Sequence, residues 1–155
     1  TVALKKALDS ITPSDADFVE AFATTRVSTA PFARYYLRAL EMTAKGEKEP
    51  WYKPLEDKDI INLEHVLPKK PEDNWPNFNE DDVAKYVNRL GNLALLQFSK
   101  NSDLKSAKFD EKKKIYASSP YILTSQIAEV DEWTPTAIAN RQKTMADLSR
   151  KTWPI

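Results

Sequence analysis

The sequence predicts an α+β domain that is mostly helical, with one short antiparallel strand pair embedded among the helices. Apolar residues recur at helical spacing along most of the 155 residues. Two short apolar stretches, 59–68 and 92–98, break that spacing and are bounded by turn formers or proline, which is typical of strands. The chain contains only two glycines, and Gly46 and Gly91 each stand at the end of a helical stretch.

Start signals mark the individual helices. Ser14, followed three residues later by an acid, predicts a capping box, and Asn79 precedes acids that suit the first turn of a helix. Pro120 and Pro135 each follow a hydroxyl residue, which is the pattern of an N-cap and a first helical position. A further helix is expected from residue 101 to residue 117.

The stretch from Pro31 to Gly46 predicts a helix with a proline in its first turn and a glycine just past its end. Its apolar stripe is expected to face the core, and consists of Phe32, Tyr35, Tyr36, Ala39 and Leu40. The tryptophans are expected to pack in the core or between domains, not to stack on bases; they are Trp51, Trp75, Trp133 and Trp153.

Composition excludes several classes of protein. No window approaches the 18 apolar residues of a membrane span. Cysteine is absent, which excludes disulfides, thiolate chemistry and cysteine-ligated zinc and fits a cytosolic setting. Lys+Arg and Asp+Glu are equal at 23 each, which argues against a free-standing nucleic-acid binder but leaves room for a local basic patch.

The only histidine stands at a junction between predicted elements. His65 follows Glu64 at the end of the first strand, in "NLEHVLPKKP". A lone histidine is by itself more often structural than catalytic. Two asparagines at later junctions favour a site: Asn92 enters the second strand and Asn101 enters the next helix. A turn residue and a helix cap are the alternative interpretations of these asparagines.

Three motifs in this order carry a family likeness: "EHVLP", "LGNLALL" and "KNSDLKSAKFDEKKKIY". They resemble the HNH branch of the His-Me finger (ββα-metal) endonucleases, and most closely the C-terminal nuclease domain of GmrSD-type modification-dependent (type IV) restriction enzymes. The likeness covers residues 31–155 and includes a closing helix in "WTPTAIANRQKTMADLSRKTW". Residues 1–30 carry no motif and are expected to form a helical extension toward a missing upstream module.

The resemblance implies a metal-dependent endonuclease that hydrolyses DNA. His65 matches the general base, which suits an imidazole with an ordinary pKa of about 6.5. Asn92 matches the asparagine that supports the catalytic site. Glu64 and Asn101 match the ligands of Mg²⁺ or Mn²⁺, hard ions that take oxygen donors. Many such sites have aspartate where this chain has Glu64, whose extra methylene changes its reach.

A basic patch is expected beside this site. Lys105, Lys108 and Lys112 would share one face of the predicted helix and grip the DNA backbone, with Lys69 and Lys70 adding to the patch. Lys112 also matches the family's "F..K" pattern. A solvated helix face is the alternative interpretation of these lysines.

Targeting is expected to come from a partner module. The resemblance implies an NTPase or sensor domain, on the same chain or a partner subunit, in a restriction or antiviral defence protein of the bacterial or archaeal cytoplasm. The start at Thr1 suggests a piece of a longer protein. The alternative is a catalytically inactive domain that keeps the nuclease fold for docking; an RNA substrate is a third possibility.

Overall fold

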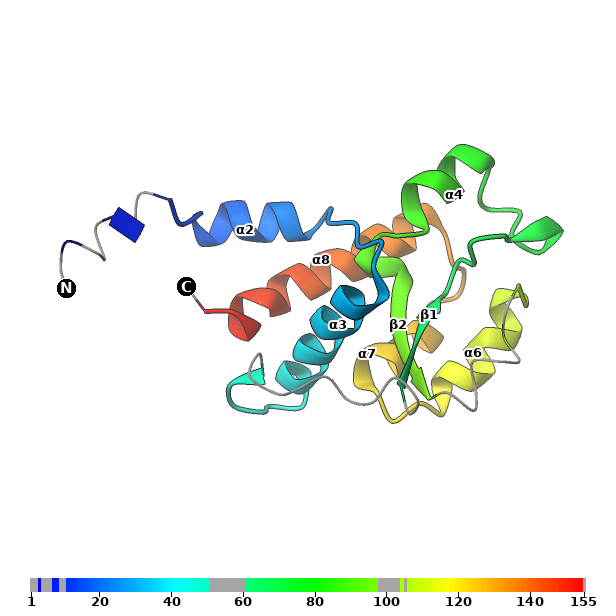
Figure 1. Ribbon diagram of the computed structural model, residues 1–155. Helices are drawn as coiled ribbons and strands as arrows, with labels where there is room; N and C mark the ends of the chain where they lie inside the picture. The colour runs from blue at the N-terminus through cyan, green and yellow to red at the C-terminus, as the bar shows by residue number, and fades with distance from the viewer. Residues whose placement is uncertain are drawn as a thin grey trace.

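Two short antiparallel strands lie at the centre of the structure, between helices on both sides (Figure 1). The computed structural model describes residues 3, 7, 8, 11–50, 61–97, 104 and 106–154. Within these residues the helices and strands are α2 (Asp15–Phe22), α3 (Ala30–Ala44), β1 (Ile61–His65), α4 (Glu80–Tyr86), β2 (Leu93–Gln97), α6 (Phe109–Ala117), α7 (Ile122–Ser125) and α8 (Pro135–Thr152). Short 3-10 helices span Glu72–Asn74, Leu90–Asn92 and Gln126–Glu129. The predicted α+β class, mostly helical with one strand pair, is confirmed.

The register of the strand pair decides which side chains share a face of the sheet. Glu64 pairs with Ala94, and His65 pairs with Leu93. Successive residues of a strand point to opposite faces, so the Glu64 and His65 side chains leave the sheet on opposite sides. Ala94 belongs to one hydrophobic cluster and Leu93 to another.

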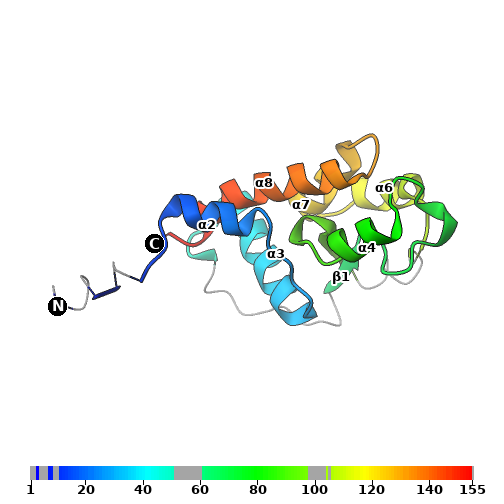
Figure 2. The same ribbon diagram turned by 90° about the horizontal axis from the view of Figure 1, so that it is seen from above.

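These two clusters form two cores that share the sheet. The first lies between the sheet, α2, α3 and α8, and contains Phe22, Leu37, Leu40, Leu93 and Met145. The second lies on the α6 side, and contains Leu96, Tyr116, Ile127, Trp133 and Ile138. α8 contributes to both cores and runs along one side of the molecule beside α2 and α3 (Figure 2).

Several predicted helix starts are confirmed. Ser14 and Asn79 each form a capping box with an aspartate three residues later. Thr134 caps α8 through the Ala137 amide, with Pro135 as the first helical residue, and α3 also has a proline in its first turn. The Ser119-Pro120 expectation is wrong, because α7 begins at Ile122 with Tyr121 as its N-cap.

The two glycines have different physical causes. Gly46 has a φ of 76° just past α3, as expected of a C′ residue. Gly91 was expected to stand at the end of a helix, and this is wrong. α4 ends at Tyr86, and Gly91 lies in a 3-10 helix without a positive φ. A Cβ at Gly91 would come within 2.4 Å of the Ile138 carbonyl oxygen, so close packing against α8 requires this glycine.

Two other expectations need correction. The helix expected from residue 101 begins at Phe109, and its first eight residues include Leu104 and 106–108, which are not helical. Phe32 of the expected α3 core stripe is 64% exposed, although Ala39 and Leu40 of that stripe are buried.

The first 30 residues contribute to the core. Phe22 of α2 and Val27, in the segment after it, pack with Leu37 and Leu40 of α3. A domain boundary at residue 30 remains a prediction, and apolar packing crosses that point. No helix among the described residues has the length and apolar character needed to cross a membrane.

The tryptophans pack as expected where they are described. Trp75 and Trp133 are buried in the second core, and Trp153 packs against the first. Trp51 lies outside the described residues.

Candidate functional site

The strand exit after β1 forms the wall of an open pocket. Its volume is about 430 Å³, and its lining includes Glu64, His65, Lys69, Lys70 and Ser106. Lys69 and Lys70 are exposed, and His65 is partly exposed. The pocket thus combines one imidazole with two exposed lysines, and its lining also includes the acidic residues Glu64 and Glu72.

The environment of His65 keeps its ring neutral. Burial lowers the pKa of His65 to about 4, and the nearby charges of Lys69 and Lys112 act in the same direction. A side-chain hydrogen bond with Asn88 opposes these effects and raises the pKa. A bond that favours the charged ring is one in which an imidazole N–H donates to the Asn88 carbonyl oxygen. The second ring nitrogen is then left with a lone pair that can accept a proton.

Asn88 is the site residue that the sequence did not reveal. It lies between α4 and the 3-10 helix Leu90–Asn92, where its backbone carbonyl accepts from Val27 N at 2.8 Å. The neighbouring Val87 carbonyl accepts from Asn92 Nδ2 at 3.0 Å, and the same amide donates to Leu67 O. Asn92 thus ties the Asn88 segment to the His65 segment. The motif "YVNRLGN" offers no signal that separates Asn88 from a solvated loop asparagine.

Asn92 supports the site from inside the protein. It is completely buried, and its Oδ1 accepts from Leu67 N at 2.8 Å and from Trp133 Nε1 at 3.0 Å. Its Nδ2 donates to Leu67 O and Val87 O, so all four hydrogen-bonding positions of the amide are used. Asn92 therefore fixes the backbone that carries His65 and has no free atom to offer a substrate.

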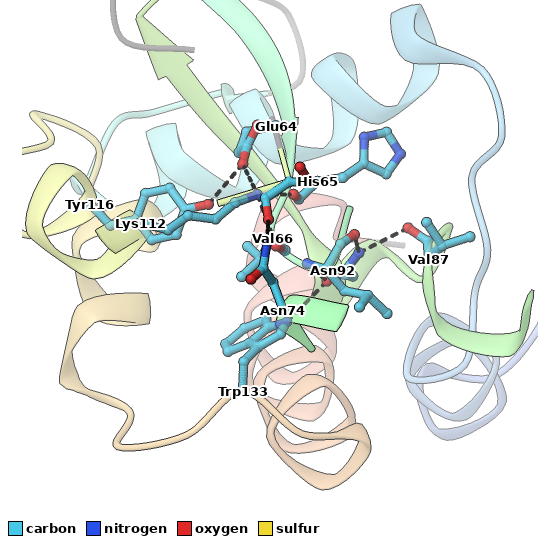
Figure 3. Close-up of polar contacts among 11 residues, drawn as sticks. Glu64, His65, Val66, Asn74, Val87, Asn92, Lys112, Tyr116 and Trp133 are labelled. Carbon is cyan, nitrogen blue, oxygen red and sulfur yellow. Dashed lines mark hydrogen bonds and ion pairs between the residues drawn. The ribbon is translucent and has the colours of Figure 1, made fainter. Parts of the chain in front are cut away.

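A buried charged cluster lies on the opposite face of the sheet from the His65 ring. Lys112 Nζ donates to Glu64 Oε1 at 2.7 Å, and the Tyr116 hydroxyl donates to the same oxygen at 2.9 Å. Figure 3 shows Lys112 and Tyr116 directed at the Glu64 carboxylate while the His65 ring points away from it. Burial raises the pKa of Glu64 and lowers the pKa of Lys112, and the attraction within the pair opposes both shifts.

Glu64 as it lies does not fit a Mg²⁺ ligand. Its side chain is only 7% exposed, and its Oε1 is held by a cation and a hydroxyl. Within the described part of the chain, no three His, Cys, Asp or Glu side chains are grouped so that they could hold a metal ion. Asn101, the other ligand implied by resemblance, lies outside the described residues.

Two of the three lysines expected on one helix face, Lys108 and Lys112, do not share an exposed face. Lys105 lies outside the described residues, Lys108 is the exposed N-cap of α6, and Lys112 is completely buried. The exposed lysines beside the imidazole are Lys69 and Lys70, which directly follow the strand exit. Among the described residues, the exposed lysines that line the His65 pocket therefore come from the segment that follows β1.

Comparison with known protein families gives one match. Residues 12–148 match the family described as GmrSD restriction endonucleases, C-terminal domain. No curated protein matches the chain. The family match spans most of the 155 residues and includes β1, β2, α6 and most of α8. The chain therefore belongs to the family of GmrSD restriction endonuclease C-terminal domains.

Proposed function

We propose that this chain is a metal-dependent DNA endonuclease domain of the HNH type, with His65 as the general base. The observation that carries the proposal is the neutral, partly exposed imidazole, hydrogen-bonded by Asn88 at a pocket with two exposed lysines. Membership of the restriction endonuclease family supports DNA as the substrate. An NTPase or sensor domain, on the same chain or a partner subunit, is proposed to select the target.

In the proposed reaction, the free ring nitrogen of His65 takes a proton from water, and the water oxygen attacks the phosphorus. The bond to the 3′ oxygen breaks, and that oxygen then takes a proton from solvent. A phosphodiester in the pocket places negative charge near the ring, which raises the pKa of His65 from about 4 toward the neutral range. The Asn88 carbonyl stabilises the imidazolium that forms.

A divalent ion such as Mg²⁺ or Mn²⁺ would neutralise charge on the phosphate and on the departing oxygen. Such ions are often held by few protein groups, with water and phosphate completing the shell. Asn101 is the protein ligand that we propose. Glu64 is left out of this proposal because its carboxylate is held by Lys112 and Tyr116.

The proposal is tested by nicking of supercoiled plasmid with Mg²⁺ or Mn²⁺, in the presence of the upstream partner module. Wild type should nick, EDTA should abolish nicking, and His65→Ala should reduce the rate by about 10²- to 10⁴-fold, the usual contribution of a general base. Asn140→Ala, at an exposed position on α8, is the control and should retain wild-type activity. Equal activity in His65→Ala and wild type would refute the proposed base, and inert wild type would favour the docking alternative.

The lysines beside His65 give a second prediction. Replacing Lys69 and Lys70 with alanine should weaken binding to duplex DNA of any sequence, because each side chain is exposed at the pocket. Two lost phosphate contacts should reduce the slope of log K against log salt by about 1.8. Binding is measured by fluorescence anisotropy over a salt series, with Lys143→Ala, at an exposed position on α8, as the matched control. An unchanged salt slope would show that DNA does not cross this pocket.

A further inference from the structure

We propose that Glu64 and Lys112 are positioning residues: a buried ion pair that holds the backbone around His65, and neither a metal ligand nor a DNA contact. Both side chains are buried and lie on the face of the sheet opposite the imidazole, and the small exposed part of Glu64 reaches the lining of the pocket that His65 also lines. The catalytic part of this inference rests on the proposed function, whereas its structural part does not.

The hydrogen bonds of the Lys112 ammonium use all of its donors. Its ammonium nitrogen contacts three acceptors: Glu64 Oε1 at 2.7 Å, His65 O at 3.0 Å and Val66 O at 3.0 Å. An ammonium has three N–H donors and no acceptor, so these three oxygens use every donor of the charged form. The side chain has no exposed surface and no remaining donor for a phosphate.

The contacts of the Glu64 carboxylate show where this side chain lies. Its Oε1 accepts both Lys112 Nζ and the Tyr116 hydroxyl, and Tyr116 is itself completely buried in the second core. The carboxylate therefore lies among groups of α6 and on the side of the sheet that the His65 ring does not occupy. A charge buried at this depth is stable only with a partner, and Lys112 is that partner.

The backbone of residues 65–67 is held by side chains from two directions. Lys112 of α6 donates hydrogen bonds to the carbonyl oxygens of His65 and Val66. The Asn92 side chain accepts from Leu67 N and donates to Leu67 O. The Asn92 backbone carbonyl accepts from Val66 N at 3.0 Å. The chain leaving β1 thus has its polar groups fixed, and the direction of the His65 side chain is fixed with them.

The ion pair is tested by a double-mutant cycle on thermal unfolding at pH 7. Glu64→Gln leaves a buried ammonium without its counter-charge, and Lys112→Met leaves a buried carboxylate alone; each should lower Tm by about 10 °C. The double variant E64Q/K112M removes both charges, so its Tm loss should be clearly smaller than the sum of the single losses. The exposed pair Asp15–Arg150, at 3.2 Å, is the matched control: D15N and R150M should show no coupling.

The positioning role needs a readout other than stability. His65 is the only histidine, so its imidazole NMR signals are assigned without ambiguity. In E64Q/K112M, well below its Tm, those signals should shift, because the His65 and Val66 carbonyls have lost their donor. Nicking by this folded variant should fall by about tenfold or more, as for other residues that orient a catalytic group.

The outcomes separate this inference from the proposed function. Additive Tm losses, an unmoved His65 signal in the double variant, or a Glu64→Gln protein that keeps its Tm but loses Mn²⁺ affinity in calorimetry would each overturn it. Coupled Tm losses and a shifted signal support it even when wild type does not cut DNA, a result that would refute only the proposed function. Nicking by wild type together with uncoupled losses would leave the function standing and remove the ion pair.

Discussion

The environment of a single side chain decides what His65 can do. A free imidazole is half protonated near pH 6.5, whereas burial and Lys69 keep this one neutral at physiological pH. The ring keeps contact with solvent at a pocket wall, so it can still exchange a proton with a bound water. Neutrality, access and a fixed orientation are the three properties that a general base requires.

Asn88 and Lys69 should move the pKa of His65 in opposite directions. Asn88→Ala removes a bond that favours the charged ring, so the pKa should fall below about 4; Lys69→Ala removes a like charge, so it should rise. Asn88→Asp keeps the acceptor and adds negative charge, which should raise the pKa most. All three are measured by NMR titration of the sole imidazole. A wild-type value in Asn88→Ala would mean that the amide does not bond the ring.

At this scale the sequence was informative about some residues of the site and silent about others. His65 stands out because it is the only histidine and lies at the end of the first strand. Asn92 stands out because it is a turn-forming amide at the start of the second strand. The pairing of Glu64 with Lys112 could not be predicted from the sequence. They lie 48 positions apart, and only the packing of α6 on the sheet brings them to 2.7 Å.

Among the secondary-structure elements, the strand pair was predicted well because local signals define it. Both strands were placed within two or three residues of their ends, since proline and polar turns bound them. The start of α6 was missed by eight residues, because Asn101 and the lysines that follow read as a helix by composition. A local sequence pattern does not reveal which surface an element packs against. The surface of α8 that Gly91 packs against also decides the role of this glycine.

Gly91 is where the 3-10 helix before β2 touches α8. Gly91→Ala would place a Cβ 2.4 Å from Ile138 O and 2.8 Å from Gln142 Cβ, and the backbone of a long helix cannot move aside. The free energy of unfolding should fall by about 3 kcal/mol, the upper range for overpacking. Gly46→Ala meets no atom within 4 Å but keeps a φ of 76°, so it should cost only about 1 kcal/mol. Urea unfolding of both variants measures the difference, and equal losses would show that backbone conformation, not packing, governs Gly91.

At the scale of the whole molecule, α8 connects the two cores to the site. Arg141 donates to Gly91 O at 2.7 Å and to Leu93 O at 2.9 Å, and Gln142 accepts from Gly91 N at 3.1 Å. Trp133, just before α8, donates to Asn92. The closing helix therefore fixes the entry to β2 while α6 fixes the exit of β1. A site of this kind depends on the entire fold, so its residues should respond together to conditions that loosen the fold.

Acid should reveal that dependence through His65. The pKa of its ring is about 4 when folded and about 6.5 when unfolded, so the unfolded chain binds a proton more readily. The stability from this group is complete above pH 6.5 and is lost as pH falls toward 4, by at most about 3.4 kcal/mol. Glu64, whose pKa burial raises, acts in the opposite sense, and other carboxylates titrate in the same range. Comparison with His65→Gln isolates the imidazole: between pH 7 and 4.5, urea unfolding should show wild type losing more stability than the variant. Parallel curves would mean that the ring is as free to protonate in the folded protein as in the unfolded chain, and a base held neutral by its surroundings would then be untenable.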